Sequence, residues 1–99
     1  MKKVSIMVPA YNEEQVLQKL FIELDKLMAR HSDYDWEVLF INDGSKDATL
    51  DIIKEKRKSD NRYCYVSLSR NFGKEKAMAA GFDFATGDCL INMDADLQD

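Results

Sequence analysis

The sequence predicts an α/β fold built on a parallel sheet, and two observations lead to this prediction. Short apolar runs alternate with segments of helical periodicity, so that four expected strands are joined by three expected helices. The runs are continuous stretches of Val, Ile, Leu and Phe, which is typical of strands that helices cover on both faces. At 99 residues and 45% hydrophobic content, the chain has enough apolar material for the core of a single domain.

The first strand is predicted at residues 4–9, and a helix follows it. Asn12 is placed to cap this helix, with Glu13 and Glu14 in its first turn, where carboxylates favour the positive end of the helix dipole. One apolar face then recurs at spacings of three and four residues and predicts the buried side of the helix. This face consists of Leu17, Leu20, Phe21, Leu24, Leu27 and Met28. We expect the helix to end near residues 31–33.

The second strand is predicted at residues 36–43 and ends in an Asn-Asp-Gly turn signal. Ser45 or Asp47 is expected to cap the second helix, because both side chains accept hydrogen bonds from the first free N–H groups of a helix. Leu50 and Ile53 are expected on the inward face of that helix.

Residues 63–69 are predicted as the third strand, 72–86 as the third helix and 89–94 as the fourth strand. Small residues on the inward face of the third helix would let it pack closely on the sheet, and Gly87 is expected to end it. The expected inward residues are Ala77, Ala80, Gly81 and Phe84. The whole pattern is βαβαβαβ, with crossovers expected to be right-handed.

The charge balance and the cysteines exclude several classes of protein. The net charge of −4 is opposite in sign to what nucleic acids require. Cys64 and Cys89 lie singly within apolar runs, so we interpret them as reduced, buried residues of a cytoplasmic protein rather than as a disulfide or metal pair. The start of the chain lacks the apolar core of a signal peptide, and no apolar stretch reaches the roughly 18–20 residues that span a bilayer. The chain as given is expected to be soluble.

Polar residues follow each of the four predicted strands. Because ligands of open α/β sheets bind beyond the carboxyl ends of the strands, these residues are expected to gather at one edge. They include Tyr11, Asn12, Glu13, Asn42, Asp43, Ser45, Arg70, Asn71, Lys74, Lys76, Asp94, Asp96, Gln98 and Asp99. Taken singly, Asp43 reads as a turn residue, and Arg70 and Lys74 read as solvated charges. Their coincidence at four strand ends favours a functional site.

The residues at these strand ends favour a metal-bound diphosphate over a glycine-rich phosphate loop. The segment PAYNEE after the first strand contains no glycine, and the chain has no G-x-x-x-x-G-K-[ST] motif. Carboxylates can instead hold a diphosphate through a divalent cation such as Mg²⁺ or Mn²⁺. Asp94 and Asp96 point the same way in an extended chain, and Gln98 continues the spacing. An Asp-x-Asp pair is short and common, so the plain end of a strand is the alternative.

Four segments in order resemble the N-terminal, donor-binding half of family 2 glycosyltransferases with the GT-A fold. They are VSIMVPAYNEEQVL, FINDGSKDAT, SLSRNFGKEKAMAAGFDFATGD and NMDADLQD. The last two are most similar to polyprenyl-phosphate sugar transferases, the group like dolichol-phosphate mannose synthase and bactoprenol glucosyltransferase. The resemblance covers essentially the whole chain. It implies a Rossmann-like parallel sheet with strand order 3-2-1-4.

The resemblance also implies roles for the matching residues. The residues after the first strand would line a nucleoside pocket, Asp43 would contact the base or the ribose, and Arg70 with Lys74 nearby would face the phosphates. The implied nucleotide-binding residues are Pro9, Ala10, Tyr11, Glu13, Asp43, Arg70, Lys74, Asp94 and Ala95. The implied ligands of Mg²⁺ or Mn²⁺ are Asp94, Asp96 and Gln98. The matching segments imply no particular catalytic residue.

The implied reaction is an inverting transfer of a hexose from a UDP- or GDP-sugar to an acceptor. Similarity to the subgroup favours a polyprenyl phosphate, and a glycan of cell-surface polysaccharide synthesis is the alternative. The metal would stabilise charge on the departing nucleoside diphosphate. In such proteins the acceptor half lies beyond residue 99, often before membrane helices, so we expect a truncated chain that is inactive alone and a full-length protein at the cytoplasmic face of a membrane. An exposed edge of the fourth strand is expected to favour self-association.

Three other functions fit the pattern less well. A non-catalytic module that binds nucleoside diphosphates would differ from the enzyme only in the residues after position 99. A phosphatase with a D-x-D-x-[TV] motif would carry that motif after the first strand rather than the fourth. A receiver-like or flavodoxin-like domain would leave Asp94 and Asp96 without a role.

Overall fold

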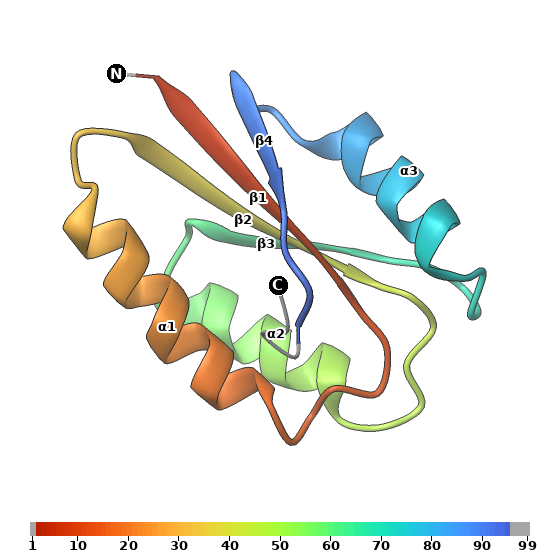
Figure 1. Cartoon of the computed structure of the whole chain (residues 1–99). Helices are drawn as coiled ribbons and strands as arrows, with labels where there is room; N and C mark the ends of the chain where they lie inside the picture. The colour runs from red at the N-terminus through yellow and green to blue at the C-terminus, as the bar shows by residue number, and fades with distance from the viewer. Residues whose placement is uncertain (1, 96–99) are drawn as a thin grey trace.

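The computed structural model describes residues 2–95, which form a four-stranded sheet with helices on both faces (Figure 1). The elements are β1 (Lys3–Ala10), α1 (Leu17–Arg30), β2 (Asp35–Asn42), α2 (Thr49–Ser59), β3 (Tyr63–Ser67), α3 (Lys74–Phe84) and β4 (Cys89–Asn92). The strand order is β3-β2-β1-β4, and all three pairings are parallel. The alternation of elements, the parallel sheet and the strand order are therefore confirmed.

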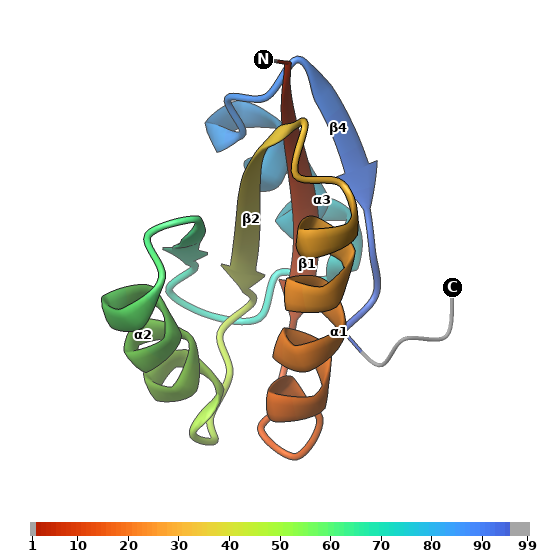
Figure 2. The same cartoon turned by 90° about the vertical axis from the view of Figure 1, so that its left-hand side faces the viewer.

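The helices divide between the two faces of the sheet, as Figures 1 and 2 show. α1 and α2 lie on one face, where the chain steps outward from β1 to β2 and then to β3. α3 lies on the other face, where the chain returns past β1 to β4. Because the direction of travel and the face reverse together, the three crossovers share one hand, as expected for parallel sheets.

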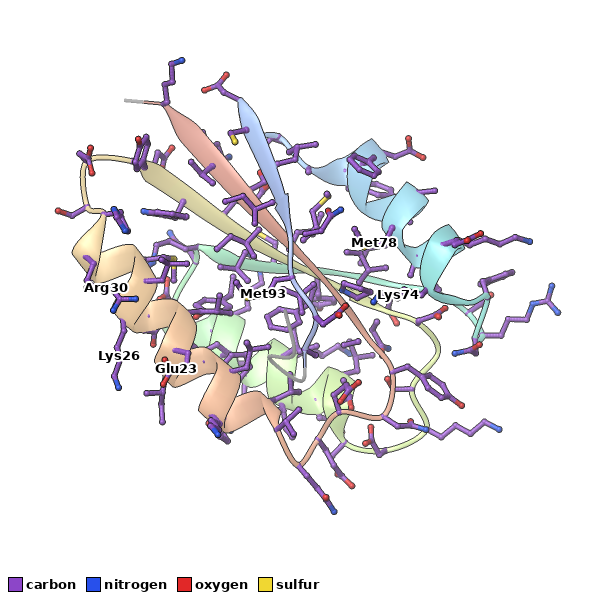
Figure 3. All side chains as sticks on the ribbon, viewed as in Figure 1. Glu23, Lys26, Arg30, Lys74, Met78 and Met93 are labelled. Atoms are coloured by element: carbon purple, nitrogen blue, oxygen red, sulfur yellow. The ribbon has the colours of Figure 1, made fainter. Side chains whose placement is uncertain are left out.

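The larger apolar cluster joins α1 to the sheet. In it the ring of Phe21 packs edge-on against Phe40 and Tyr63, with ring centroids 5.8 and 5.5 Å apart. The predicted apolar face of α1 is confirmed, because all its members are buried except Leu27, which is partly buried. Burial of each large side chain stabilises the fold by roughly 1.5–3 kcal/mol. Glu23 and Lys26 lie on the outer face of the helix, where they form an ion pair of 3.8 Å (Figure 3).

The smaller cluster lies between α3 and the sheet and consists of Met7, Leu39, Ile41 and Ala77. Close approach is possible because Gly81 is buried here, and a Cβ atom at this position would lie only 3.0 Å from Cδ1 of Ile41. The small inward face that the sequence predicts is thus confirmed at Ala77 and Gly81. Met78 packs partly buried against the same cluster (Figure 3).

The start of α1 differs from the prediction. The helix begins at Leu17, its N-cap is Val16, and Val16 makes no side-chain capping bond. Asn12 lies in the preceding loop with a φ of 53°, and its Oδ1 atom accepts a hydrogen bond from the N–H of Lys46 at 2.8 Å. The predicted capping role of Asn12 is wrong because its side chain holds the loop after β2 instead.

The end of α3 also differs from the prediction. Phe84 is 60% exposed rather than inward-facing. Ala85, the next residue, packs instead against the smaller cluster between α3 and the sheet. Gly87 does not end the helix, whose C-cap is Ala85. A glycine is needed at position 87 because a Cβ atom there would lie 2.5 Å from Oγ of Ser5.

The sheet is covered on both faces only at its centre. β1 and β2 are largely buried, whereas all four residues of β4 are exposed, including Leu90 and Ile91 at 38% and 39%. β4 pairs with β1 alone in the described sheet, and α3 packs on β1, β2 and β3. The prediction that both cysteines are buried is therefore wrong, because Cys64 is half-buried and Cys89 is exposed.

The described helices are short. Within residues 2–95, none is both long enough and apolar enough to cross a membrane.

Candidate functional site

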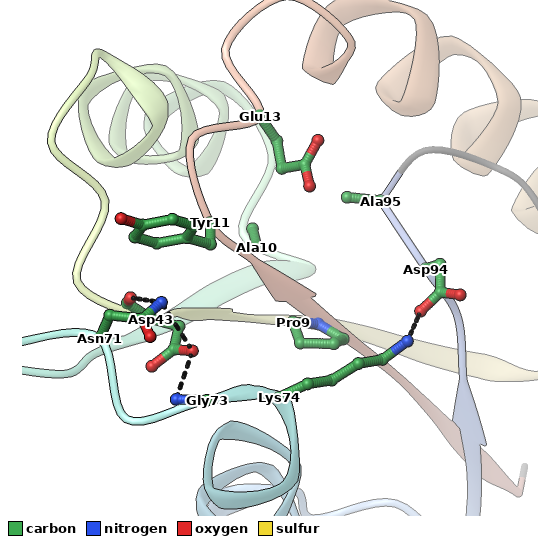
Figure 4. A pocket seen from close by; sticks show the side chains of 10 residues that line it. All are labelled: Pro9, Ala10, Tyr11, Glu13, Asp43, Asn71, Gly73, Lys74, Asp94 and Ala95. Carbon is green, nitrogen blue, oxygen red and sulfur yellow. Dashed lines mark hydrogen bonds and ion pairs between the residues drawn. The ribbon is translucent and has the colours of Figure 1, made fainter.

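A cavity of about 610 Å³ lies at the carboxyl edge of the sheet (Figure 4). It is formed by the end of β1 and its following loop, the residue after β2, the start of α3, and the segment after β4. Its lining residues are Pro9, Ala10, Tyr11, Glu13, Asp43, Asn71, Gly73, Lys74, Asp94 and Ala95. The parallel arrangement creates this site because every strand delivers its carboxyl end to the same edge.

Hydrogen bonds between two loops fix the Tyr11 side of the cavity. The N–H of Asn12 donates to Oγ of Ser45 at 3.0 Å, and the N–H of Glu13 donates to Oγ1 of the buried Thr49 at 2.8 Å. These bonds tie the loop after β1 to the loop after β2. They hold the ring of Tyr11, which is 39% exposed, and the carboxylate of Glu13 at the cavity.

Asp47 holds the same pair of loops from the outside of the cavity. Its carboxylate accepts hydrogen bonds from the N–H groups of Glu14 and Thr49 and from the hydroxyl of Thr49. Desolvation acts to raise the pKa of Asp47, but the hydrogen bonds from Thr49 act against it and the pKa is lowered. The prediction that Ser45 or Asp47 is the N-cap of α2 is wrong, because the N-cap is Ala48, which makes no side-chain capping bond. Asp47 lies one residue earlier and accepts the hydrogen bond of Thr49, the first N–H of the helix.

Asp43 forms the floor of the cavity next to the start of α3. It is only 4% exposed, and its two carboxylate oxygens accept hydrogen bonds from the N–H groups of Phe72 and Gly73 at 2.8 and 3.1 Å. The side-chain amide of Asn71 donates to the same carboxylate at 3.3 Å. A buried carboxylate is costly without such partners, so these bonds stabilise both Asp43 and the segment that contacts it.

Lys74 and Asp94 face each other across the mouth of the cavity. The ammonium nitrogen of Lys74 lies 2.5 Å from Oδ1 of Asp94, and the two side chains are 64% and 28% exposed. Figure 4 shows the Lys74 side chain extending beneath Pro9 to reach Asp94, with Glu13 on the opposite wall. The cavity is thus lined by one ammonium group and by the carboxylates of Glu13, Asp43 and Asp94.

The cavity brings together all of the predicted nucleotide-binding residues except Arg70. Arg70 lines a neighbouring hollow of about 470 Å³, which shares Tyr11 and Asn71 with the first cavity. Its guanidinium carbon lies 4.7 Å from the centroid of the Phe72 ring, a cation–π contact. Asp96 and Gln98 lie outside the described residues.

Asn71 and Gly73 line the cavity although neither is among the implied nucleotide-binding residues; Asn71 is one of the polar residues expected at this edge, whereas Gly73 is not. Gly73 has a φ of 98°, a backbone conformation that favours glycine. Gly73 falls within the predicted helix of residues 72–86, whereas α3 begins at Lys74 and Gly73 is its N-cap. The role of Asn71 depends on its contact with Asp43, which is 28 residues earlier in the chain.

The donor atoms of the cavity suit a hard divalent cation. Glu13 and Asp94 present carboxylate oxygens, the ligand type that Mg²⁺ and Mn²⁺ prefer. Within residues 2–95, no cluster of three or more His, Cys, Asp or Glu side chains has the geometry to hold a metal ion. Asp94 is the predicted metal ligand that the described chain places at the cavity.

The fold and the cavity define an α/β domain that binds a polar ligand at the carboxyl edge of a parallel sheet. The family model described as glycosyl transferase family 2 matches residues 5–99. The chain therefore belongs to glycosyl transferase family 2, and its described sheet is that of the GT-A fold.

Several curated proteins are similar to this chain. A prophage bactoprenol glucosyl transferase homolog of Escherichia coli K12 is 46% identical over 97 residues, which are 98% of this chain and 31% of that protein. A putative glycosyltransferase CsbB of Bacillus subtilis is 48% identical over 95 residues, which are 96% of this chain and 29% of that protein. The chain thus spans about a third of the length of these relatives.

Solved structures of two transferases share the fold. S. aureus TarS, residues 1–349, aligns with a TM-score of 0.80 and 29% identity over 95% of this chain and 27% of that one. The same TarS region has been solved with UDP-GlcNAc, with 28% identity to this chain. The mannosyltransferase PcManGT of Pyrobaculum calidifontis, solved with GDP-Man and Mn²⁺, aligns with a TM-score of 0.74 over 96% of this chain and 28% of that one, and at 24% identity shows similarity of fold alone.

Proposed function

We propose that residues 1–99 are the donor-binding half of a hexosyltransferase that uses a UDP- or GDP-sugar. One observation carries this proposal. Residues from the ends of β1, β2 and β4 and from the start of α3 line a single polar cavity of about 610 Å³. A cavity of this size matches a ligand of the size of a nucleotide. The TarS complex with UDP-GlcNAc supports a sugar nucleotide as the ligand.

The walls of the cavity suit the parts of such a donor. Pro9, Ala10 and Tyr11 offer an apolar surface and an exposed ring against which a base or ribose packs. Lys74 offers the positive charge that a diphosphate needs. Arg70 stands at the adjacent hollow beside Tyr11, where its guanidinium adds positive potential near the phosphates.

A divalent cation is part of the proposed site, held by Asp94 and by Asp96 and Gln98. When bound, Mg²⁺ or Mn²⁺ would neutralise charge on the departing nucleoside diphosphate. Within the described chain, Lys74 holds the Asp94 carboxylate at the cavity mouth. The carboxylate of Glu13, on the wall that faces this pair, adds a further negative charge to the cavity. The charged groups Lys74 and Asp94 thus lie at one side of the proposed site, and the apolar surface at Tyr11 lies at another.

The proposed acceptor is a polyprenyl phosphate, and the proposed reaction inverts the anomeric centre. Relatives named bactoprenol glucosyl transferase, such as that of Shigella phage SfX at 45% identity, support a lipid acceptor. With a lipid acceptor, the proposed location of the full-length protein is the cytoplasmic face of a membrane.

Titration of the chain with UDP and GDP, each with and without Mn²⁺, tests the donor site. We expect metal-dependent binding of one of the two nucleotides, and the tighter one identifies the donor class. The double variant Asp94→Ala/Asp96→Ala should weaken that binding at least roughly tenfold, about 1.4 kcal/mol.

The matched control is Asp33→Ala/Asp35→Ala, a second Asp-x-Asp pair with both residues exposed. Asp33 precedes β2 and Asp35 begins it, so the pair lies at the amino edge of the sheet, opposite the cavity. This control removes the same charge and should leave binding unchanged. Equal losses in both double variants, or no binding of either nucleotide by a folded chain, would contradict the proposed function.

A further inference from the structure

We propose that Asp43 is a positioning residue, which holds the segment 71–73 so that Lys74 enters the donor cavity in the right place. This inference rests on the proposed function. The family resemblance gives Asp43 a direct contact with the base or the ribose. The contacts of its carboxylate point to a different role.

The carboxylate of Asp43 is engaged by three N–H donors from one segment. The N–H of Phe72 donates to Oδ1, whereas the N–H of Gly73 and the side-chain amide of Asn71 donate to Oδ2. Asn71 also donates to the backbone carbonyl of Asp43 at 3.2 Å. Both oxygens therefore already accept hydrogen bonds from within the chain, in a residue that is 4% exposed.

The start of α3 needs such an acceptor. Its N-cap is Gly73, which has no side chain, and no side-chain capping bond is made from that position. The first N–H groups of a helix have no intrahelical partners, and a negative charge near them is favourable. Asp43 supplies that charge from a different element, at the N–H groups that directly precede α3.

Gly44 adds a second contact between the same two segments. It has a φ of 71°, and a Cβ atom there would lie 2.3 Å from the backbone carbon of Arg70 and 2.4 Å from the nitrogen of Asn71. The backbone after β2 and the backbone before α3 thus lie in direct contact. Asp43 and Gly44 together fix where α3 begins.

The first residue of α3 is Lys74, which reaches Asp94 across the cavity mouth. Loss of the Asp43 carboxylate would release the segment 71–73 and displace the backbone of Lys74. In this role, loss of the carboxylate weakens phosphate binding. If Asp43 instead contacted the base, its loss would weaken nucleoside binding and leave phosphate binding unchanged. The two roles therefore differ in which part of the donor loses affinity.

The variant Asp43→Asn separates these roles because it keeps the shape of the side chain. A carboxamide has one acceptor oxygen and an NH₂ group, so one of the two N–H donors at Phe72 and Gly73 would face another donor. We expect faster amide hydrogen exchange at residues 72–75, by roughly tenfold or more, in the ligand-free chain. Asn71→Ala, which removes only the side-chain donor, should give a smaller change in the same direction.

Three ligands then test the role in binding, each followed by NMR shifts of the labelled chain: Mg²⁺–pyrophosphate, uridine and guanosine. Asp43→Asn should weaken pyrophosphate binding roughly tenfold and leave nucleoside binding within about twofold. The control is Asp60→Asn, a half-buried carboxylate that holds Arg62 between α2 and β3, at the opposite edge of the sheet. This control should destabilise the fold without changing either affinity.

Weaker nucleoside binding with unchanged pyrophosphate binding would overturn the positioning role, as would unchanged amide exchange in Asp43→Asn. If the wild-type chain binds none of the three ligands and neither UDP nor GDP, the proposed function fails. In that case the exchange rates at residues 72–75 still decide whether Asp43 fixes the segment.

Discussion

The ammonium group of Lys74 and the carboxylate of Asp94 form an ion pair of 2.5 Å that joins the start of α3 to the segment after β4. The two residues are 20 positions apart and lie on different sides of the cavity. Asp94 is a proposed metal ligand, so the lysine occupies a carboxylate that a cation would use. Under the proposed function, a bound cation would compete with Lys74 for this carboxylate, and we expect the ammonium group to turn toward the phosphates of the donor.

Lys74→Met should affect the metal and the nucleotide in opposite directions. Without the lysine, Asp94 has one competitor fewer, so we expect Mn²⁺ alone to bind up to about fivefold tighter, the limit set by the energy of an exposed ion pair. The metal–nucleotide complex should bind roughly three- to tenfold more weakly, because a charge that faces the phosphates is lost. Calorimetric titrations with Mn²⁺ alone, and then with UDP or GDP, measure both changes.

Lys76→Met is the matched control for this prediction. Lys76 is exposed on the same helix, and its ammonium nitrogen lies 5.9 Å from the centroid of the Phe72 ring, away from the cavity lining. The substitution Lys76→Met removes the same charge as Lys74→Met from the same region. Equal effects of the two substitutions would show that only the general potential matters and would contradict a specific Lys74–Asp94 pair.

The architecture could be predicted from sequence because its causes are local. The apolar periodicity of α1 predicts its buried face directly. Every second residue of β1, at Val4, Ile6 and Val8, belongs to the larger apolar cluster. The carboxyl-edge rule then gathers the strand ends without further information. Most of the candidate site therefore follows from the pattern of elements.

The remaining features depend on partners that are distant in the chain. Asn12 looks like a helix cap, but its side chain accepts a bond from Lys46, 34 residues later. Asp43 looks like a turn residue, yet its donors lie 28 to 30 residues away. Cys89 lies in an apolar run typical of a covered strand, although β4 pairs with β1 alone in the described sheet. Such contacts are set by tertiary structure, which local patterns do not encode.

Gly87→Ala should destabilise the fold. The added Cβ atom would lie 2.5 Å from Oγ and 2.7 Å from the backbone nitrogen of Ser5, a buried residue of β1 that cannot move aside. The N–H of Gly87 also donates to Oγ of Ser5 at 2.9 Å, and this bond would be strained. We expect a loss of about 1–3 kcal/mol in the free energy of unfolding, measured by urea denaturation.

Gly81→Ala provides the comparison for this substitution. Its Cβ atom would meet Cδ1 of Ile41 at 3.0 Å and Sδ of Met7 at 3.2 Å, both ends of flexible side chains. Alanine within a helix gains roughly 0.5–1 kcal/mol over glycine, which offsets part of the crowding. We expect a change close to zero, and a loss as large as that of Gly87→Ala would refute this account of the two glycines.

Glu37→Gln should remove part of the acid sensitivity of the fold. Burial acts to raise the pKa of Glu37, but hydrogen bonds from Thr86 and Ser5 and the charge of Lys3 together lower it below the ordinary value of 4.5. A carboxyl with a lowered folded-state pKa contributes stability above the unfolded value, and this contribution is lost as the pH falls through the folded value. The wild-type chain should therefore lose stability below about pH 4.5, and Glu37→Gln should lose less over the same range.

Thermal unfolding between about pH 6 and pH 3 measures this difference. At neutral pH the substitution should cost about 1 kcal/mol, because the amide keeps one acceptor of the original two. The control is Glu55→Gln, whose carboxylate is 73% exposed and pairs with Lys58 on the surface of α2. Parallel acid curves for the wild type and Glu37→Gln would disprove the role of this carboxyl.

Tyr63→Phe should reduce the loss of stability on the alkaline side. Tyr63 is fully buried, and its hydroxyl donates to Oδ1 of Asp25 at 2.7 Å. Burial, and then the hydrogen bond to Asp25, raise the pKa of Tyr63 well above its ordinary value of 10.0. A raised folded-state pKa means that stability is complete below the unfolded value and declines as the pH rises above it, because only the unfolded tyrosine ionises readily.

The phenylalanine variant lacks this ionisation, so its stability should change less between about pH 9 and pH 11. At neutral pH it should be less stable by about 1 kcal/mol, since Asp25 keeps its ion pair with Lys56 at 2.8 Å and loses only the hydroxyl. Tyr34→Phe is the control, because Tyr34 is 40% exposed and packs edge-on against Trp36. Urea denaturation of the three chains across this range compares them directly. If Tyr63→Phe declines as steeply as the other two, the buried hydroxyl does not control the alkaline limit of the fold.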